Sequence, residues 1–483
     1  MTDRFPTRLI IGGEAVESAS GDTFPVMNPA TEEELTRVSE ANAPDVDNAV
    51  RSARSTFESD AWQRMSARQR GERLYRLAEL IHASRDELAR LETLNNGKPL
   101  FEAAIDVRLA VETYRYYAGW ADKIHGETIP VDGPFLNYTL REPLGVVGAI
   151  VPWNFPISLA AWKIGPALAC GNTIVLKPAE QTPFTAIRMA ELALEAGFPP
   201  GAFNCIPGFG PTAGVALVAH PEVDKIAFTG STTVGQQVMR EAAGTVKKLS
   251  LELGGKSPNI VFADADLDAA ARGALSGIFY GKGEVCAAGS RLLVEESVRE
   301  DLTARILERA KRMVPGDPLH PKTRLGSLVS REQRDRVMGF IESARAEGAT
   351  LLAGGEPATV NGKGFFVQPT IFGDVQPEMR IAREEVFGPV LAMMTFDGGV
   401  EGAVRAANAS IYGLAAGIWT RDLKKALRAA RAVRAGTVWI NTYNMYDAAS
   451  PFGGFKQSGF GRDLGMHALE GYTQVKSVWV DLS

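Results

Sequence analysis

Two segments of the sequence contain residues that suit a covalent reaction. Cys286 lies in the segment GKGEVCAAGSR (281–291), where glycines and small residues allow a substrate to approach the thiol closely. Glu252 lies upstream, in the segment LELGGKSP (251–258). A thiol is a strong nucleophile and a carboxylate can activate water. If the fold brings the two segments together, the chain holds both halves of a covalent mechanism.

The flanking residues separate Cys286 from the other two cysteines. Its glycine and charged neighbours argue against an ordinary place in an apolar core. Cys170 ends an apolar, helix-like run and Cys205 lies inside a strand-like run, so both are expected to be buried structural thiols. Three scattered cysteines are too few for a disulfide framework, which favours a reducing, cytoplasmic location.

Asn154 is a third candidate, because it lies between prolines in the segment PWNFP (152–156). The prolines restrict the backbone, so the side-chain amide could be held in place to donate to a developing oxyanion. A simple turn asparagine is the alternative interpretation of this residue taken in isolation.

The composition excludes several classes of protein. The chain has 483 residues, of which 45% are hydrophobic and 23% charged, an ordinary globular composition. Such a length indicates about two to three domains. A net charge of −5 without a basic run gives no support for a nucleic-acid or anionic-membrane partner. No segment approaches the roughly 20 apolar residues of a membrane span, and no secretory signal is visible. The histidines lack the spacing of a zinc site, so no metal is expected.

The elements that must position these residues are predicted to form a parallel sheet. Five short β-rich runs alternate with helix-like stretches, which is typical of βαβ units. The runs are 146–151, 173–176, 203–206, 225–228 and 248–251. Ligands of such sheets bind at the carboxyl ends of the strands. Polar or glycine-rich segments follow each run, at 152–156, 177–180, 207–210, 229–232 and 252–255. The sequence therefore predicts one continuous ligand-binding rim.

Further elements are expected on both sides of this region. Apolar spacing predicts one helix over 46–57, and a capping pattern at Ser66 predicts another running toward Asn95. A second α/β region, roughly 256–455, has helical patterns near 298–313 and 331–347. It has strand-like runs at 366–372 and 437–441. The segment 127–141 is predicted to be a hairpin and 474–482 an edge strand. Because exposed strand edges need a partner, we expect an oligomer.

The rim contains candidate nucleotide-binding residues, each with an ordinary alternative. The segment 208–214 is one residue too long for a dinucleotide fingerprint, which favours a plain strand-to-helix turn. The segment 230–235 follows a strand and opens a helix, so its amides could meet a phosphate. Glu180, after Lys177, could accept the hydroxyls of a ribose and repel a 2′-phosphate, or the two could form a surface ion pair.

Seven ordered motifs resemble the aldehyde dehydrogenase superfamily over nearly the whole chain. They are PWNFP (152–156), KPAE (177–180), FTGST (228–232), LELGGKSPN (251–259), GEVCAAGSR (283–291), EEVFGPV (384–390) and SPFGGFKQSG (450–459). The resemblance implies an α/β fold with a Rossmann-variant cofactor domain, an α/β catalytic domain and a β-hairpin oligomerisation arm. We expect the NAD-binding domain at 1–121 and 144–254, the catalytic domain at 255–455, and oligomerisation or bridging segments at 122–143 and 456–483.

The resemblance also assigns catalytic roles. Cys286 would attack the aldehyde to form a thiohemiacetal, whose oxyanion the Asn154 amide and the Cys286 backbone N–H would hold. Hydride would pass to NAD, leaving a thioester, and Glu252 would activate the water that releases the carboxylate. The chemistry of each residue type suits its step.

The resemblance extends to binding residues. Those it places at the cofactor are Ile150, Val151, Pro152, Trp153, Lys177, Glu180, Gly210, Phe228, Gly230, Ser231, Val234, Leu253, Glu385 and Phe387. Glu180 favours NAD over NADP, although some family members with this glutamate use both. Those it places along the substrate tunnel are Phe155, Leu159, Trp162, Tyr446 and Phe452.

The tunnel residues are aromatic or apolar, which predicts an uncharged aliphatic or aromatic aldehyde as substrate. The same aromatic side chains could instead surround a quaternary ammonium, as in betaine-aldehyde or aminoaldehyde enzymes. A CoA-acylating enzyme is disfavoured by Glu252, and a non-catalytic structural protein by the intact catalytic residues. The expected assembly is a dimer or a tetramer.

Two departures from the family pattern stand out. Many members carry Asn and Gln where this chain has Gly281 and Glu284. An acid aimed at the nucleophile would disfavour the thiolate, whereas one that points away would not. In addition, a glutamate common in a late motif is Asp463 here, which puts a secondary water-activating role at that position in doubt.

Overall fold

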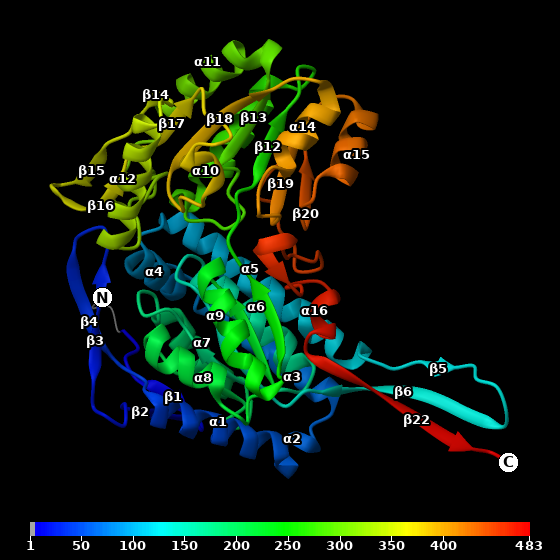
Figure 1. The fold of residues 1–483 in the computed structure, drawn as a ribbon. Coiled ribbons are helices and arrows are strands. Elements are labelled where there is room, and N and C mark those ends of the chain that lie inside the picture. The colour runs from blue at the N-terminus through cyan, green and yellow to red at the C-terminus, as the bar shows by residue number, and fades with distance from the viewer. Residues whose placement is uncertain (1–4) are drawn as a thin grey trace.

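The computed structural model describes residues 5–483 and shows two α/β bodies and a projecting arm (Figure 1). In that view the blue-to-green first body lies below the green-to-orange second body. The arm extends to one side and carries the C-terminus at its tip. The prediction of an α/β fold with two sheets and a hairpin arm is confirmed.

The first body is built on an eight-stranded sheet with the order β2-β1-β9-β8-β7-β10-β11-β21. The five predicted runs are its neighbouring strands β9, β8, β7, β10 and β11, which pair only in parallel with one another. The strands are β1 (Leu9–Ile11), β2 (Glu14–Val16), β7 (Val146–Ile150), β8 (Thr173–Lys177), β9 (Phe203–Cys205), β10 (Lys225–Thr229), β11 (Lys248–Glu252) and β21 (Gly459–Phe460). A separate hairpin, β3 (Thr23–Asn28) and β4 (Glu33–Ser39), lies beside this sheet.

Both faces of this sheet are covered, because successive strand residues point to opposite sides. Val146 and Val175 pack with α1, α8 and α9, while Val147 and Ile174 pack with α6 and α7. The helices of this body are α1 (Ala43–Glu58), α2 (Asp60–Gln63), α3 (Ala67–Ala83), α4 (Arg85–Asn96), α5 (Leu100–Trp120), α6 (Pro156–Ala169), α7 (Phe184–Glu195), α8 (Val215–Ala219) and α9 (Thr232–Ala242). Continuous apolar runs therefore mark strands buried on both faces.

The second body is a seven-stranded sheet with the order β14-β17-β18-β13-β12-β19-β20, parallel except for β14. Its strands, with the hairpin β15–β16, are β12 (Pro258–Val261), β13 (Arg291–Glu295), β14 (Thr350–Ala353), β15 (Pro357–Val360), β16 (Lys363–Val367), β17 (Thr370–Gly373), β18 (Val390–Phe396), β19 (Ala415–Trp419) and β20 (Thr437–Ile440). The helices are α10 (Leu267–Phe279), α11 (Arg299–Ala310), α12 (Arg331–Ala346), α13 (Arg380–Arg383), α14 (Gly399–Asn408) and α15 (Leu423–Ala432). The short helix α16 (His467–Glu470) leads into the last strand.

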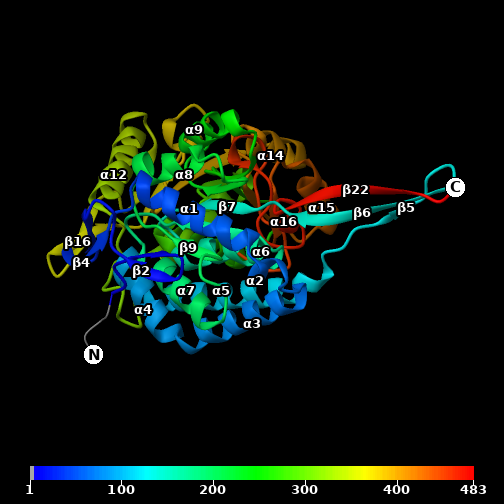
Figure 2. The same ribbon diagram turned by 90° about the horizontal axis from the view of Figure 1, so that it is seen from below.

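The arm is a three-stranded sheet with the order β22-β6-β5, made by β5 (Thr128–Ile129), β6 (Phe135–Pro143) and β22 (Thr473–Asp481). The hairpin and the tail strand, far apart in sequence, pair antiparallel from Thr473↔Pro143 to Asp481↔Phe135. Both views show the arm standing away from the rest of the molecule (Figure 2). The predicted edge strand is confirmed, since β22 has a neighbour on one side only.

Two predicted elements are each divided in the structure. The helix expected to run from Ser66 toward Asn95 is two helices, because Ser84 leaves the helical conformation with φ −92° and ψ 12°, which ends α3 before it and starts α4 after it. The strand-like run 366–372 is also two strands, since β16 ends before Pro369 and β17 begins after it. Proline has no N–H to give to a ladder, which explains the second break.

Candidate active site

The nucleophile loop, residues 280–286, connects α10 to the segment before β13. Gly281, Lys282 and Gly283 all have left-handed backbone angles, with φ of 57°, 61° and 72°. A Cβ on Gly283 would lie 2.1 Å from the carbonyl oxygen of Gly388. Glycine is therefore required at this position, and the tight loop turns Cys286 toward the first body.

The structure brings the Cys286 and Glu252 segments together. Glu252 is the last residue of β11, and Gly255, just beyond it, lies so close that its Cβ would be 2.3 Å from the Cys286 carbonyl oxygen. Protein atoms surround most of the Cys286 thiol, and the residue as a whole is half-buried. Burial first, and then the charges of Glu385 and Glu252, raise the pKa of Cys286 to about 12, while the backbone N–H groups of Ala287 and Cys286 lower it. The resting thiol is protonated at neutral pH.

Glu252 is a buried carboxyl group, 4% exposed, and no group of residues 5–483 hydrogen-bonds to either of its oxygens. Gly453 makes room for it, since a Cβ there would lie 2.7 Å from Glu252 Oε1. Burial, and then the charge of Asp463, raise the pKa of Glu252 well above its usual value, against the opposing effect of Lys163. A carboxylate with a raised pKa and free oxygens can take a proton from water.

Asn154 reaches the nucleophile loop from the other body. Its Nδ2 donates to the Glu284 carbonyl oxygen at 2.9 Å, and its Oδ1 is buried without a partner in the described chain. A side-chain amide has two N–H groups, so one remains to meet an oxyanion. The Glu284 side chain itself turns away from the thiol, because its Oε1 accepts from the Val329 backbone N–H at 3.0 Å.

Lys177 and Glu180 lie at the carboxyl end of β8. Lys177 Nζ donates to the carbonyl oxygens of Pro178, at 2.7 Å, and Gly208, at 2.6 Å, which ties two rim loops together. Burial lowers the pKa of Lys177 to about 8, partly offset by the charge of Glu180. The Glu180 carboxylate is 3.9 Å from Lys177 Nζ and only half-buried. A carboxylate that is partly exposed at this edge can accept hydrogen bonds from hydroxyl groups.

The start of α9 and the Glu385 loop complete the rim. Ser231 caps α9 by accepting from the Val234 N–H at 3.3 Å. Glu385 Oε1 accepts from the Gly255 N–H at 3.0 Å, and burial raises the pKa of Glu385 to about 7. Phe387, at φ 61°, packs edge-on against Trp153 with ring centroids 5.2 Å apart.

The remaining predicted cofactor residues lie along the same edge of the first sheet. They are Ile150 at the end of β7 with Val151 and Pro152 after it, Gly210 after β9, Phe228 near the end of β10 with Gly230 just after it, and Leu253 after β11. A Cβ at Gly210 would meet no atom within 4 Å, so the rim is open there. An open rim with exposed amides, a half-buried carboxylate and a second carboxyl group fits a dinucleotide with two riboses.

Three of the five predicted tunnel residues form one aromatic group around Trp162. Its ring centroid is 5.5 Å from that of Phe452 and 6.3 Å from that of Tyr446, which is 5.7 Å from Phe452. Leu159 lies one turn earlier on α6. Burial raises the pKa of Tyr446, and the charge of Cys286 adds to this, so the group lies near the nucleophile. Phe155 stands apart, stacked on Tyr280 at 6.2 Å.

Sequence patterns did not identify the charged side chains that support these residues. Lys98 donates to the Asn154 carbonyl oxygen at 2.9 Å, and Lys163 forms a buried ion pair with Asp463. Lys98 and Lys163 are separated from their partners by 56 and 300 residues. The sequence marked Glu284 and Asp463 as departures from the family pattern, but not that either is buried.

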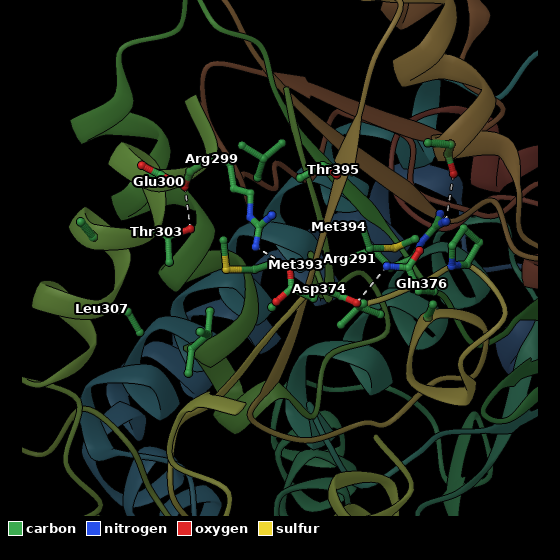
Figure 3. Close-up of a pocket in the computed structure, with 18 of the residues that line it drawn as sticks. Arg291, Arg299, Glu300, Thr303, Leu307, Asp374, Gln376, Met393, Met394 and Thr395 are labelled. Atoms are coloured by element: carbon green, nitrogen blue, oxygen red, sulfur yellow. Dashed lines mark hydrogen bonds and ion pairs between the residues drawn. The ribbon is translucent and has the colours of Figure 1, made fainter. Parts of the chain in front are cut away.

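A separate cavity of about 660 Å³ lies at the carboxyl ends of β17 and β18, beside α11 (Figure 3). Arg299 and Asp374 on its wall form an ion pair with each other, and Thr303 bonds to the Arg299 backbone. None of the predicted site residues lines it. Within residues 5–483 no cluster of histidine, cysteine and acidic side chains is placed to hold a metal ion. No helix in that range is long and apolar enough to cross a membrane.

The raised pKa of Cys286 gives a test that needs no substrate. Below its pKa the thiolate fraction rises about tenfold per pH unit, so alkylation by iodoacetamide should accelerate from about pH 7 to pH 10 without a plateau. Glu385→Gln removes a negative charge from beside the thiol, lowers its pKa and should make alkylation several-fold faster at pH 8. Mass spectrometry of the Cys286 peptide measures the rate, with Cys286→Ala as the blank. A plateau below pH 9 would contradict this account of the thiol.

Comparison with known proteins agrees with this geometry. The sequence model of the "Aldehyde dehydrogenase family" matches residues 15–478. A putative aldehyde dehydrogenase DhaS of Bacillus subtilis is 52% identical over 98% of this chain and 96% of its own. Human retinal dehydrogenase 2 is 51% identical over 99% of this chain and 92% of its own. The NAD+ complex of an aldehyde dehydrogenase from Bacillus cereus superposes with a TM-score of 0.97 at 51% identity, covering 99% and 97% of the two chains. The chain belongs to the aldehyde dehydrogenase family.

Proposed function

We propose that Cys286, Glu252 and Asn154 carry out the NAD-dependent oxidation of an aldehyde to its carboxylic acid, the activity of this family. One observation carries the assignment. A buried carboxyl group without a hydrogen-bond partner in the described chain lies close enough for its charge to raise the pKa of the thiol, and an amide from the other body meets the thiol's own loop. Each group suits a different step.

The first bond forms between the Cys286 sulfur and the aldehyde carbon. The thiol gives its proton to water as the S–C bond forms, and the carbonyl oxygen becomes an oxyanion that accepts from Asn154 Nδ2 and the Cys286 backbone N–H. Bound NAD supplies the acceptor for the hydride. Loss of hydride leaves a thioester on Cys286. Glu252 then takes a proton from water, the hydroxide adds to the thioester carbon, and the carboxylic acid leaves as the sulfur regains its electron pair.

The rim residues are proposed to hold NAD. Glu180 would accept the adenosine ribose hydroxyls, the amides beside Gly230 and Ser231 would meet the pyrophosphate, and Glu385 would hold the nicotinamide ribose. A carboxylate at Glu180 repels a 2′-phosphate, which supports a preference for NAD over NADP. The other predicted rim residues would line the same groove.

The aromatic group around Trp162 supports an uncharged aliphatic or aromatic aldehyde as the substrate. Trp162 and Phe452 are buried and Tyr446 half-buried, and none of the five tunnel residues is basic. The name of the similar human retinal dehydrogenase 2 also points to an apolar aldehyde. The three free cysteines, of which one is the nucleophile, support a reducing cytoplasmic location.

We also propose the division into an NAD-binding domain at 1–121 and 144–254, a catalytic domain at 255–455, and bridging segments at 122–143 and 456–483. The two separate sheets support it. The segment 456–483 contributes to two sheets, because its strand β21 pairs in the first sheet and its strand β22 pairs in the arm. Exposed apolar side chains on the arm, including Phe135, Trp479 and Val480, support its role in forming a dimer or tetramer.

Glu252→Gln should separate the two halves of the reaction. Hydride transfer should still give a burst of one NADH per Cys286, while steady-state turnover falls about 10²- to 10⁴-fold because water is no longer activated. Since burial raises the pKa of Glu252, wild-type deacylation should speed up with rising pH at pH values above the usual pKa of a glutamate, and the variant should lack this rise. Stopped-flow absorbance of NADH measures both phases.

The matched control is the exposed Glu332→Gln, which should behave as wild type. Full steady-state activity in Glu252→Gln would contradict the base assignment. Product formation that depends on added CoA would instead favour an acylating enzyme.

A panel of aldehydes tests the substrate class. Hexanal and benzaldehyde should have higher kcat/KM than betaine aldehyde or a charged aminoaldehyde, because the aromatic group offers apolar contact and no countercharge. NAD should give a higher kcat/KM than NADP with each substrate. A charged aldehyde that outperforms both uncharged ones would overturn the substrate proposal.

The arm should control assembly. Trp479 is 59% exposed, and Trp479→Lys places a charge on a surface that we expect another subunit to cover. The variant should elute as a smaller species in light-scattering chromatography. Val314→Lys, at a 65% exposed site beyond α11, is the control and should leave the mass unchanged. A wild-type protein that is monomeric at micromolar concentration would contradict the proposal.

A further inference from the structure

A cluster of buried charged side chains lies beneath the loops that hold Asn154 and Cys286. We call it the buried charge cluster, and its members are Glu92, Lys98, Glu102, Asp106, Lys282 and Glu284. Every member is at most 2% exposed, and none of them touches the reacting atoms in the mechanism above. Buried charges are expensive unless they are paired, so their presence beneath the site needs a physical reason.

Lys282 fixes the nucleophile loop from below. Its Nζ forms an ion pair with Glu284 Oε2 at 2.8 Å, and donates to Asn96 at 3.0 Å (backbone oxygen) and 2.6 Å (side-chain oxygen). The other Glu284 oxygen accepts from the Val329 N–H at 3.0 Å. With both carboxylate oxygens engaged, the peptide of Glu284 has little freedom to rotate.

The same cluster also holds the Asn154 loop. Lys98 Nζ donates to the Asn154 carbonyl oxygen at 2.9 Å, and Asn96 Nδ2 donates to the Trp153 carbonyl oxygen at 2.8 Å. Asn96 therefore contacts both loops, since its side-chain oxygen accepts from Lys282 and its nitrogen donates to the residue before Asn154. The two halves of the oxyanion site share one support.

The backbone of Lys282 is strained in this arrangement. It has φ 61° and ψ 21°, a left-handed conformation that is unfavourable for a residue with a side chain. The Gly281 N–H beside it donates to the buried Glu102 carboxyl group at 3.2 Å. Strain of this kind persists only where the surroundings over-determine the conformation, and it gathers at functional sites.

We propose that the Lys282–Glu284 ion pair is a positioning element of the oxyanion hole. It holds the Glu284 carbonyl, that carbonyl accepts from Asn154 Nδ2 at 2.9 Å, and the second N–H of the amide is thereby aimed at the aldehyde oxygen. The inference rests on the proposed role of Asn154. Lys282 and Glu284 are positioning residues, because they act on the substrate only through the amide.

A purely structural role for the pair predicts a different result. If it only stabilised the fold, its loss would lower the melting temperature and would slow catalysis equally with or without Asn154. If it positions the amide, its loss should slow hydride transfer only while the amide is present. A double-mutant cycle with Asn154 separates the two cases.

The experiment compares Lys282→Gln with wild type in the Asn154 and the Asn154→Ala backgrounds, using the NADH burst rate with a saturating aldehyde. Asn154→Ala alone should slow the burst about 10²-fold. Lys282→Gln should slow it about tenfold in the Asn154 background, with KM for NAD unchanged within about twofold, and should have almost no further effect in Asn154→Ala.

The neutral double variant Lys282→Gln/Glu284→Gln should recover most of the rate, because two amides can replace the ion pair without leaving a lone buried charge. If Lys282→Gln does not fold, Glu284→Gln takes its place in the cycle, since its amide oxygen can still accept from Val329. The control is Lys363→Gln, which breaks an exposed ion pair with Glu33 at 2.9 Å and should leave the burst unchanged.

The outcomes distinguish this inference from the proposed function. A burst rate in Asn154→Ala equal to wild type would refute the oxyanion role of Asn154 and, with it, the positioning role. A slow Asn154→Ala combined with an equal effect of Lys282→Gln in both backgrounds would refute the positioning role alone. A strong effect that disappears in Asn154→Ala and is rescued by the double variant would support it.

Discussion

The bond from the Asn154 side-chain amide to the Glu284 carbonyl is the contact on which this site depends. It joins a loop of the first body to the loop that carries Cys286, so the amide proposed as oxyanion donor and the thiol are fixed relative to each other. The contacts around it restrict both ends. Lys98 holds the Asn154 peptide, the ion pair with Lys282 holds the Glu284 side chain, and the left-handed turn at 281–283 directs Cys286 inward. Catalysis by preorganised donors needs such rigidity, because a misaligned amide stabilises the transition state little better than water does.

Desolvation sets the chemical state of the resting site. Burial raises the pKa of Cys286 to about 12, that of Glu385 to about 7, and that of Glu252 well above its usual value. Because the site lacks water's stabilisation of charge, the thiolate of Cys286 and the carboxylate of Glu252 are both disfavoured relative to their protonated forms in water. Because only the thiolate is a strong nucleophile, a raised pKa keeps the resting Cys286 thiol from reacting with other electrophiles. The Lys163–Asp463 pair beside Glu252 balances this effect, since its two charges shift the pKa of Glu252 in opposite directions.

Much of the fold was accessible from sequence because local chemistry and tertiary structure agree there. Five apolar runs became five parallel strands, and the polar segments after them met at one edge, since parallel strands place their carboxyl ends together. The predictions were wrong where the backbone left the helical conformation, at Ser84 between α3 and α4, and where a proline intervened, at Pro369 between β16 and β17. Trp162, Tyr446 and Phe452 form one group of contacting rings, but Phe155 stacks on Tyr280 outside it, a detail of packing that residue type does not reveal.

The residue types proposed to react, their order and the family can all be identified from the sequence, because a thiol, a carboxylate and an amide in glycine- and proline-bounded segments are local features. The direction of Glu284, in contrast, depends on tertiary packing. Its side chain turns from the thiol to Lys282 and Val329, while its backbone carbonyl faces Asn154. The reason is that a buried carboxylate must find a cation and a donor, and these partners come from the loop's own lysine and from a segment 45 residues away. The partners of a buried charge are set by how the whole chain packs, so they cannot be predicted from the residues next to it in sequence.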